Sequence, residues 1–280
     1  DKTTLFISIL CLILLPVIGG IRLCILVRVV NIETSMKSCI IARGASQFLA
    51  LTTPATAGAQ IVKAYWVKST GSSWDMGFGI AYLESSFDVI MVNIMTLITI
   101  MPFIFSKNWR FLPVIVLSLY AIGSYILLFL LTGLRKSRIV LANFLRKIKL
   151  PINEAHLEKF ALGAKRLIRK PLHLILIILL TFIYLLLQSI VIMMIANTLG
   201  GNMNILNAIV FSAIMQVMGG TPTPGGSIGV EYGASLLIEP HIVVVWRVIS
   251  YYIQLINTFI LFQLFMMKHL RTTRDRITYI

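Results

Sequence analysis

The chain contains the stretch Thr221-Pro222-Thr223-Pro224-Gly225-Gly226-Ser227-Ile228-Gly229-Val230-Glu231, which follows a short apolar segment, about Ile205–Met218. A similar break, Thr52-Thr53-Pro54-Ala55-Thr56-Ala57-Gly58-Ala59-Gln60, follows a second short apolar segment, about Lys37–Leu51. As helices these segments would reach only roughly 21–22 Å, which is too short to cross a bilayer comfortably. A further short helical stretch follows each break. We therefore expect two re-entrant broken-helix hairpins.

Composition indicates that lipid is the solvent for much of the chain. Of the 280 residues, 58% are apolar and 12% are charged, and the mean hydropathy is +0.91. Soluble domains are typically about half apolar and about a quarter charged. The net charge of +15 lies mainly between apolar spans, so anionic lipid explains it better than nucleic acid.

Five segments are long and apolar enough to span a membrane, each having about 20 residues or more. They are about Thr4–Val27, Trp74–Phe105, Phe111–Gly133, Leu172–Leu199 and His241–Met267. The sequence thus predicts an all-α, polytopic integral membrane protein that forms a single transmembrane domain over residues 1–280. Because the chain begins at Asp1 without a start methionine, we expect that its N-terminus has been trimmed.

Basic residues predict the orientation in the cell membrane. The segment Leu134–Pro171 contains eleven basic and two acidic residues, and basic residues also follow the last span. Positive loops face the cytoplasm, so we expect both to be cytoplasmic. The first half (1–110) and the second half (172–280) would then share one plan with opposite orientations, separated by a central span and basic loop (111–171). If Lys37–Leu51 were instead an ordinary span, everything before it would reverse.

Paired broken segments in inverted halves mark the substrate site of many transporters. A break at membrane depth must be buried or line a wet cavity, and the N-terminus of the following half-helix suits an anionic head group. Gly225, Gly226 and Gly229 would let the backbone approach that ligand closely. The alternative is that each break is a surface loop, where proline and glycine are common.

Ionisable residues inside the spans are a second signal, because they are costly in lipid. Glu84 and Asp88 share one helix face, while Glu231 and Arg247 lie in the second half. Such groups bind a substrate, or they only tie helices together as ion pairs. We expect Glu231 to pair with Arg247 or with backbone N–H groups. Arg22 and Arg28 are expected to reach the cytoplasmic boundary by snorkelling.

The basic loop and the cysteines are interpreted without a catalytic role. Apolar residues from Ile139 to Ile148 alternate with basic ones, as in a helix that lies on an anionic membrane surface. The three cysteines are interpreted as small buried hydrophobes. The scattered histidines predict no metal site, and no nucleotide-binding loop or nucleophile elbow suggests a cofactor or an enzyme.

The same motifs resemble one family. The stretch Pro54–Tyr65 is similar to "Pro-Ala-x-x-Gly-Gly-Glu-Pro-x-Lys-Ala-Tyr" of the lysylphosphatidylglycerol synthase transmembrane-region family, notably its archaeal members. Leu83–Asp88 resembles "Leu-Glu-Arg-x-x-Asp", Pro224–Glu231 resembles "Pro-Gly-Gly-x-Gly-x-x-Glu", and Arg247–Tyr252 resembles "Arg-x-x-x-Tyr-Tyr". The resemblance implies a flippase-like domain that is often attached to a synthase or a glycosyltransferase. Gln60 and Ser85 depart from it, since they replace a glutamate and an arginine.

The leading hypothesis is a lipid flippase-like transporter, not an enzyme, that moves an anionic or glycosylated head group, possibly isoprenoid-linked. One alternative is an intramembrane lipid-modifying enzyme using Glu84 and Asp88 as acid and base. Another is a membrane anchor for a separate glycosyltransferase or lipid synthase. The candidate substrate-binding residues are Pro54, Gly58, Gln60, Lys63, Glu84, Asp88, Pro224, Gly225, Gly226, Gly229, Glu231 and Arg247.

Overall fold

The computed structural model describes residues 1–280 except 55–56, 106–108, 148–153, 222, 224–225 and 278–280. The side chains of residues 57, 102–105, 109, 144 and 269–277 are also outside the description. Pro224 and Gly225, two of the candidate site residues, therefore lie outside the described residues. Within the described part the chain is all-helical, with twelve α-helices, a short 3-10 turn and one π-helical turn.

The first half of the chain follows the expected plan of span, broken hairpin and span. Helix α1 (Lys2–Val29) is followed by α2 (Met36–Thr52) and α3 (Ala57–Ser69), and then by the long helix α4 (Trp74–Phe105). The side chain of Ser35 caps α2 by accepting a hydrogen bond from the Ser38 amide, as residues at helix N-termini commonly do. The α2–α3 pair is thus the first broken hairpin.

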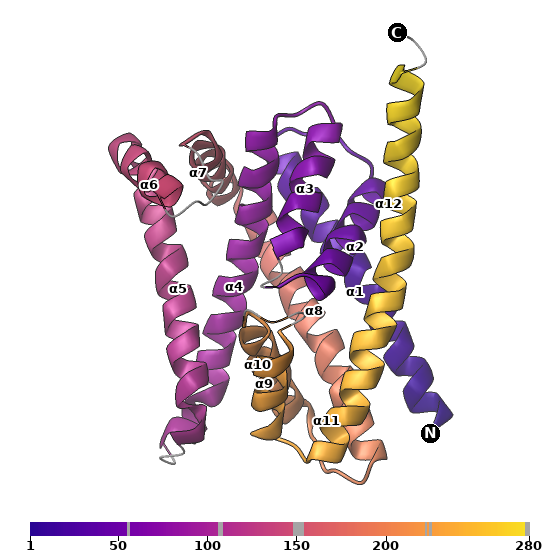
Figure 1. Ribbon diagram of the computed structural model, residues 1–280. Helices are drawn as coiled ribbons and strands as arrows, with labels where there is room; N and C mark the ends of the chain where they lie inside the picture. Colours follow the sequence, from indigo (N-terminus) through magenta and orange to yellow (C-terminus); the bar gives the residue numbers. More distant parts are fainter. Residues whose placement is uncertain (55–56, 106–108, 148–153, 222, 224–225, 278–280) are drawn as a thin grey trace.

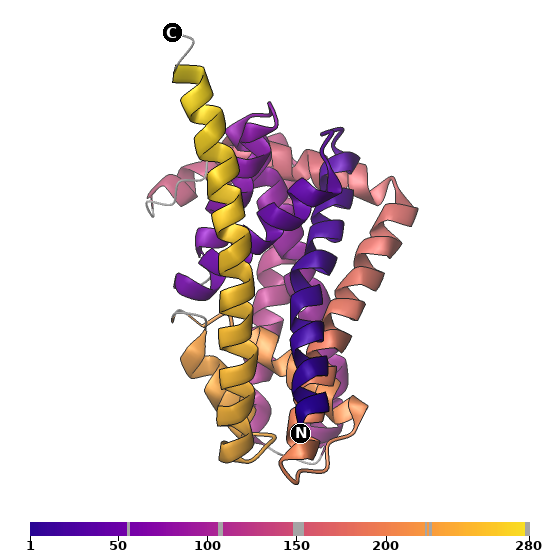
Figure 2. The ribbon, with the colours of Figure 1, turned by 90° about the vertical axis from the view of Figure 1, so that its right-hand side faces the viewer.

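The second half repeats the plan with the opposite direction. Helix α8 (Pro171–Thr198) is followed by α9 (Ile205–Met218) and α10 (Ser227–Ser235). The last span consists of α11 (Pro240–Arg247), a π-helical turn (Val248–Tyr252) and α12 (Ile253–Ile277). In Figures 1 and 2 the two hairpins enter the bundle from opposite ends, with α2 and α3 above and α9 and α10 below.

Between the halves lies a central segment of three helices. Helix α5 (Leu112–Gly133) is followed by α6 (Arg135–Lys147) and α7 (Glu154–Ile168). Helices α6 and α7 lie at the end of the bundle at which α12 also ends (Figure 1). The sequence predicted one membrane-surface helix here, whereas α7 packs against α4. Phe160 and Leu167 of α7 are buried, and His156 contacts Asp75 at 3.1 Å. Burial lowers the pKa of His156, while the charge of Asp75 opposes that change.

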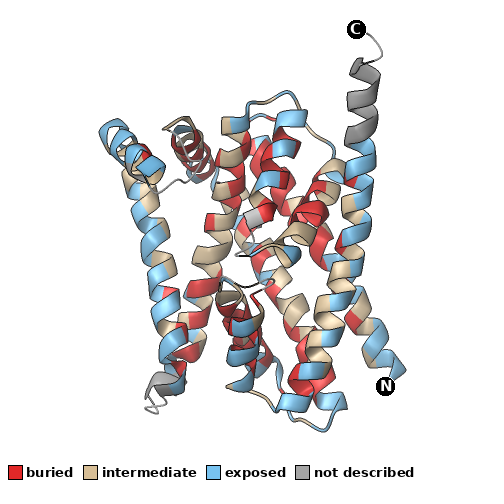
Figure 3. Ribbon diagram, in the orientation of Figure 1, coloured by how far each residue is buried: buried red, intermediate tan, exposed pale blue. Residues whose placement is uncertain are grey.

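The distribution of burial agrees with a lipid solvent. Five helices are long and apolar enough to cross a membrane, and they correspond to the five predicted spans. Buried residues concentrate inside the bundle, whereas α5 is exposed along most of its length (Figure 3). Its exposed residues are mainly large and apolar, such as Leu119, Tyr120 and Leu130. The chain is therefore a multi-pass membrane protein.

The glycines of the second break allow the backbone of that hairpin to pack closely against itself. Gly226 precedes α10 with φ +63°, a conformation that favours glycine. A Cβ at Gly226 would lie 2.3 Å from the Gly219 oxygen, and one at Gly229 would lie 2.3 Å from the Met218 oxygen. The backbone after the break thus packs directly on the end of α9. This packing role differs from the expected close approach to a ligand.

We predict that Gly226→Ala lowers the free energy of unfolding by about 2–5 kcal/mol, because it combines left-handed strain with a backbone clash. Gly200→Ala is the matched control: Gly200 has φ +86° but open space around its Cβ position, so it should cost only about 1–2 kcal/mol. Thermal unfolding in detergent, followed by fluorescence, measures both variants. Equal losses would show that the clash is unimportant.

The position of the basic helices also gives a topology prediction. A cysteine at position 147, at the end of α6, should react with an impermeant thiol reagent from the cytoplasmic side of sealed vesicles. The native cysteines, Cys11, Cys24 and Cys39, are buried and should give little background. Labelling of position 147 from the external side alone would overturn the orientation.

Candidate functional site

A single cavity lies between the two broken hairpins. Its volume is about 1010 Å³, and its wall is formed by residues of both halves of the chain. Ala59 and Gln60 line it beside the first break, and Gly219 and Gly220 line it beside the second. Residues adjoining both breaks thus line one cavity, whereas Pro54 and Gly226, which lie within the breaks, are not part of its wall. We call this space the central cavity.

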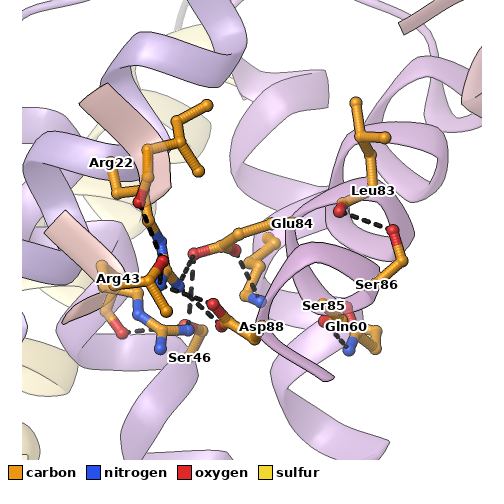
Figure 4. A network of polar contacts seen from close by, with 12 residues as sticks. Arg22, Arg43, Ser46, Gln60, Leu83, Glu84, Ser85, Ser86 and Asp88 are labelled. Carbon is orange, nitrogen blue, oxygen red and sulfur yellow. Dashed lines mark hydrogen bonds and ion pairs between the residues drawn. The ribbon is translucent and has the colours of Figure 1, made fainter. Parts of the chain in front are cut away.

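Five ionisable residues form a charge cluster on the first-half wall: Arg22, Arg43, Lys63, Glu84 and Asp88 (Figure 4). They come from α1, α2, α3 and α4. The Glu84 carboxylate is fully buried and lies 2.7 Å from the Lys63 ammonium, 3.5 Å from the Arg22 guanidinium and 3.6 Å from that of Arg43. Glu84 is therefore the centre of the cluster.

Asp88 lies at the edge of the cluster and lines the central cavity. Both of its oxygens face Arg22, with Nη1–Oδ1 at 2.5 Å and Nη2–Oδ2 at 2.6 Å. Of these two contacts only Nη2–Oδ2 has hydrogen-bond geometry, and Oδ1 accepts no hydrogen bond within the described part of the chain. The cluster contains three cations and two carboxylates, so it has a formal excess of one positive charge.

The position of Arg22 corrects the sequence prediction. Arg28 is exposed at the end of α1, but Arg22 is only 3% exposed and is part of the cluster. Snorkelling requires a path to the membrane surface, whereas tertiary packing places both carboxylates of α4 directly beside Arg22. This chain has Ser85 where the family motif has an arginine, and Arg22 supplies the charged partner of Glu84 and Asp88 instead.

The two departures from the family motif contact each other. The amide nitrogen of Gln60 donates to the Ser85 hydroxyl at 2.7 Å, and both residues line the central cavity. A neutral hydrogen bond thus occupies the place where the family motif has a glutamate and an arginine. The change removes one charge of each sign, so it leaves the net charge of the wall unchanged.

Helix α8 joins the second half of the chain to the cluster. Arg22 donates to the Thr181 hydroxyl at 3.0 Å, and Arg43 interacts with the hydroxyl of Tyr184. Thr181 and Tyr184 are one turn apart, so they share a face of α8. The charge cluster therefore ties four helices of the first half to the first span of the second.

Arg247 adds a cation on the opposite wall. It lies over the Tyr251 ring at 4.8 Å, and the Tyr251 hydroxyl donates to the Leu51 carbonyl at 3.2 Å. Glu231 acts electrostatically on Arg247, but Glu231 is exposed and is not part of the cavity wall. The expected Glu231–Arg247 relation is thus present as a charge interaction, but Glu231 lies outside the cavity.

The structure brings only part of the predicted site to the cavity. Four of the predicted residues line it: Gln60, Lys63, Asp88 and Arg247. Glu84 lies behind them and contacts Lys63. The other described members are outside the cavity wall: Pro54, Gly58, Gly226, Gly229 and Glu231. Gly58, like the glycines of the second break, packs closely within its own hairpin, against Leu49 and Thr53.

Sequence reasoning missed most of the uncharged polar wall. Five of the six glutamines in the chain line the central cavity: Gln47, Gln60, Gln188, Gln216 and Gln254. Aromatic residues from both halves, among them Trp74 and Trp246, line it as well. Glutamine inside an apolar span is the signal that could have revealed this wall, because a buried amide needs hydrogen-bond partners. Among the described residues no group of three potential metal ligands is found.

Comparison with known proteins agrees with this architecture. The model of the family "Lysylphosphatidylglycerol synthase TM region" matches residues 2–257. The chain belongs to this family. Searches of curated proteins and of solved structures found no match. The matched region includes both hairpins, the charge cluster and the central cavity, so these features belong to the family domain. The family is a membrane domain associated with lipid-related functions.

We predict that Glu84→Gln lowers the free energy of unfolding by about 3–5 kcal/mol, because three buried cations would lose their shared carboxylate. Glu239→Gln is the matched control, since the Glu239 side chain is 75% exposed and should change stability by less than about 0.5 kcal/mol. Unfolding in detergent measures both. Equal stability of the two variants would mean that the cluster does not hold the bundle together.

Proposed function

We propose that this protein moves the head group of a membrane lipid through the central cavity while the lipid tails stay in the bilayer. The head group would be anionic or glycosylated, and the two broken hairpins would be re-entrant segments that enter from opposite leaflets. The observation that carries the proposal is the central cavity itself, which lies between the two hairpins and has basic side chains on both of its walls.

The charges of the cavity wall support an anionic head group. Arg22, Arg43, Lys63 and Arg247 line the cavity, and Asp88 is the one acidic residue among the described lining residues. Arginine binds phosphate through paired hydrogen bonds, and lysine binds it as a compact charge. Ionisable groups at such a depth usually serve a substrate path.

A lipid also requires that the cavity reaches the side of the bundle. Ile61 and Trp74 line the cavity and are 57% and 38% exposed at the surface. Ile61 lies in the second turn of α3, and Trp74 is the first residue of α4. An opening beside these two residues would let the tails remain among other lipids while the head group is inside.

Transport is favoured over catalysis by the state of the two carboxylates. Glu84 is surrounded by three cations, and Asp88 is bound by Arg22 through both oxygens. A general acid or base must reach the proton that it transfers, and here cations occupy the space beside both carboxylates. The pair is therefore poorly suited to acid–base chemistry and better suited to holding the cations toward the cavity.

The proposed orientation places α6, α7 and the C-terminus in the cytoplasm, at the cell membrane. The lipid would then be supplied by a synthase or a glycosyltransferase, as the family resemblance suggests. If the chain only anchored such an enzyme, purified protein would move no lipid.

The test is head-group accessibility in reconstituted liposomes, with fluorescent lipids and a membrane-impermeant quencher. We expect protein-dependent movement of an anionic lipid, reduced at least fivefold in Arg247→Gln because a cavity cation is lost. Arg28→Gln, at an exposed position outside the cavity, is the matched control and should retain wild-type rates. No movement of any anionic or glycosylated lipid would reject the proposal.

A further inference from the structure

Some of the uncharged polar residues of the central cavity lie apart from the charge cluster, on the second-half wall. The cluster lies on α1–α4, in the first half. Three glutamines lie on the second-half wall: Gln188 on α8, Gln216 on α9 and Gln254 on α12. We call these three residues the amide wall. The cavity thus has a cluster of three cations on its first-half side, and on its second-half side three amides beside a single cation, Arg247.

We infer that the central cavity recognises a head group in which a phosphate adjoins an uncharged, hydroxyl-bearing group such as a sugar or polyol, and that it disfavours a head group carrying an ammonium. The inference rests on the proposed function and specifies its substrate class.

The charge cluster can accept a phosphate because its acidic members are already engaged. Arg22, Arg43 and Lys63 each line the cavity and share only Glu84 and Asp88 between them. The Arg22 Nε has no hydrogen-bond partner among the described residues, although Arg22 is only 3% exposed. An unpaired donor at that depth is costly. The Nε is covered in this conformation, so a phosphate oxygen would satisfy it once the Arg22 side chain turns toward the cavity.

The amide wall suits hydroxyl groups. Gln216 donates through Nε2 to Gln188 Oε1 at 2.8 Å, and no other hydrogen bond of these two side chains is found among the described residues. The pair therefore presents the Gln188 amide nitrogen as a donor and the Gln216 amide oxygen as an acceptor. A hydroxyl group both donates and accepts, so it can satisfy both at once.

Helix α8 determines the distance between the two sides. Thr181, Tyr184 and Gln188 have the spacing i, i+3 and i+7, which places them on one face. Thr181 and Tyr184 contact Arg22 and Arg43 of the cluster. Gln188 lies roughly 6 Å beyond Tyr184 along the helix axis. That spacing allows one head group to place its phosphate at the cluster and its first hydroxyls at the amide wall.

An ammonium group would find acceptors but no free counter-ion: Gln60 Oε1 and Asp88 Oδ1 accept no hydrogen bond among the described residues, yet Gln60 is neutral and Asp88 is ion-paired with Arg22. Among the described lining residues Asp88 is the one carboxylate, and Arg22 holds both of its oxygens. A desolvated ammonium would therefore lack a counter-ion and would face four cations. An aminoacylated lipid, as in the name of the family, should be a poor substrate for this chain.

The test compares four fluorescent lipids in the liposome assay. Phosphatidylinositol and phosphatidylglycerol contain phosphate and hydroxyls, phosphatidic acid contains phosphate alone, and lysyl-phosphatidylglycerol contains an ammonium. We expect the first two to move at least tenfold faster than the lysyl lipid, with phosphatidic acid between them. A phosphoisoprenoid sugar, assayed separately, distinguishes isoprenoid from glycerolipid substrates. Equal rates for all lipids, or preference for the lysyl lipid, would overturn the inference while leaving transport established.

Gln188→Glu provides a gain of function that misfolding cannot imitate. Its carboxylate would still accept from Gln216, and it would offer the cavity a free negative charge. We expect the rate ratio of lysyl-phosphatidylglycerol to phosphatidylinositol to rise at least tenfold. The matched control is Gln263→Glu, because Gln263 is exposed and is the one glutamine outside the cavity wall. The same change of ratio in both variants, or in neither, would overturn the inference.

A binding measurement separates recognition from transport. Trp74 and Trp246 line the cavity, so their fluorescence should report lipid binding in nanodiscs. If no lipid moves but phosphatidylinositol still binds at least tenfold more tightly than the lysyl lipid, the transport proposal fails and the inferred recognition stands. Equal binding of both lipids would overturn the recognition.

Discussion

The buried carboxylate of Glu84 is the constraint on which the rest of the structure depends. A carboxylate in an apolar interior is stable only when cations and hydrogen bonds surround it. Lys63, Arg22 and Arg43 supply these contacts from three different helices. Because each cation belongs to another segment, the charge of one residue determines how α1, α2 and α3 are placed around α4. Contacts of Arg22 and Arg43 with α8 extend this arrangement to the second half.

The second hairpin is held by a different kind of interaction. Gly226 and Gly229 bring the backbone after the break onto the end of α9, and the surrounding core includes Phe211 packed at right angles to Trp246. The first hairpin thus combines the charge cluster with close packing at Gly58, whereas the contacts of the second are those of close packing. The central cavity accordingly has three cations on its first-half wall and one cation, Arg247, among glutamines on the opposite wall, although the two halves share the same order of helices.

Membership of the family does not by itself identify the substrate, because the residues that line the cavity select it. The family name refers to lysylphosphatidylglycerol, yet in this chain the acidic groups near the cavity are engaged by arginine and lysine. A fold can accommodate several substrates, because selection depends on the side chains that line the site. Here the pair of Gln60 and Ser85 is neutral, and the remaining cations determine the electrostatic character of the wall.

The sequence by itself determined the membrane class, the five spans and the two breaks, because the length and polarity of a lipid-spanning helix are local properties. It also identified Glu84 and Asp88 as unusual, since charge within an apolar run is visible without coordinates, whereas Lys63 became a candidate only through the resemblance to the family motif. Only the tertiary structure decided that Arg22 pairs with these carboxylates. It also decided that five glutamines line one cavity and that Glu231 is not part of the cavity wall. Those outcomes depend on how separate helices rotate and pack against one another. That geometry is set by contacts between residues distant in sequence, such as Arg22 with Asp88 and Gln188 with Gln216.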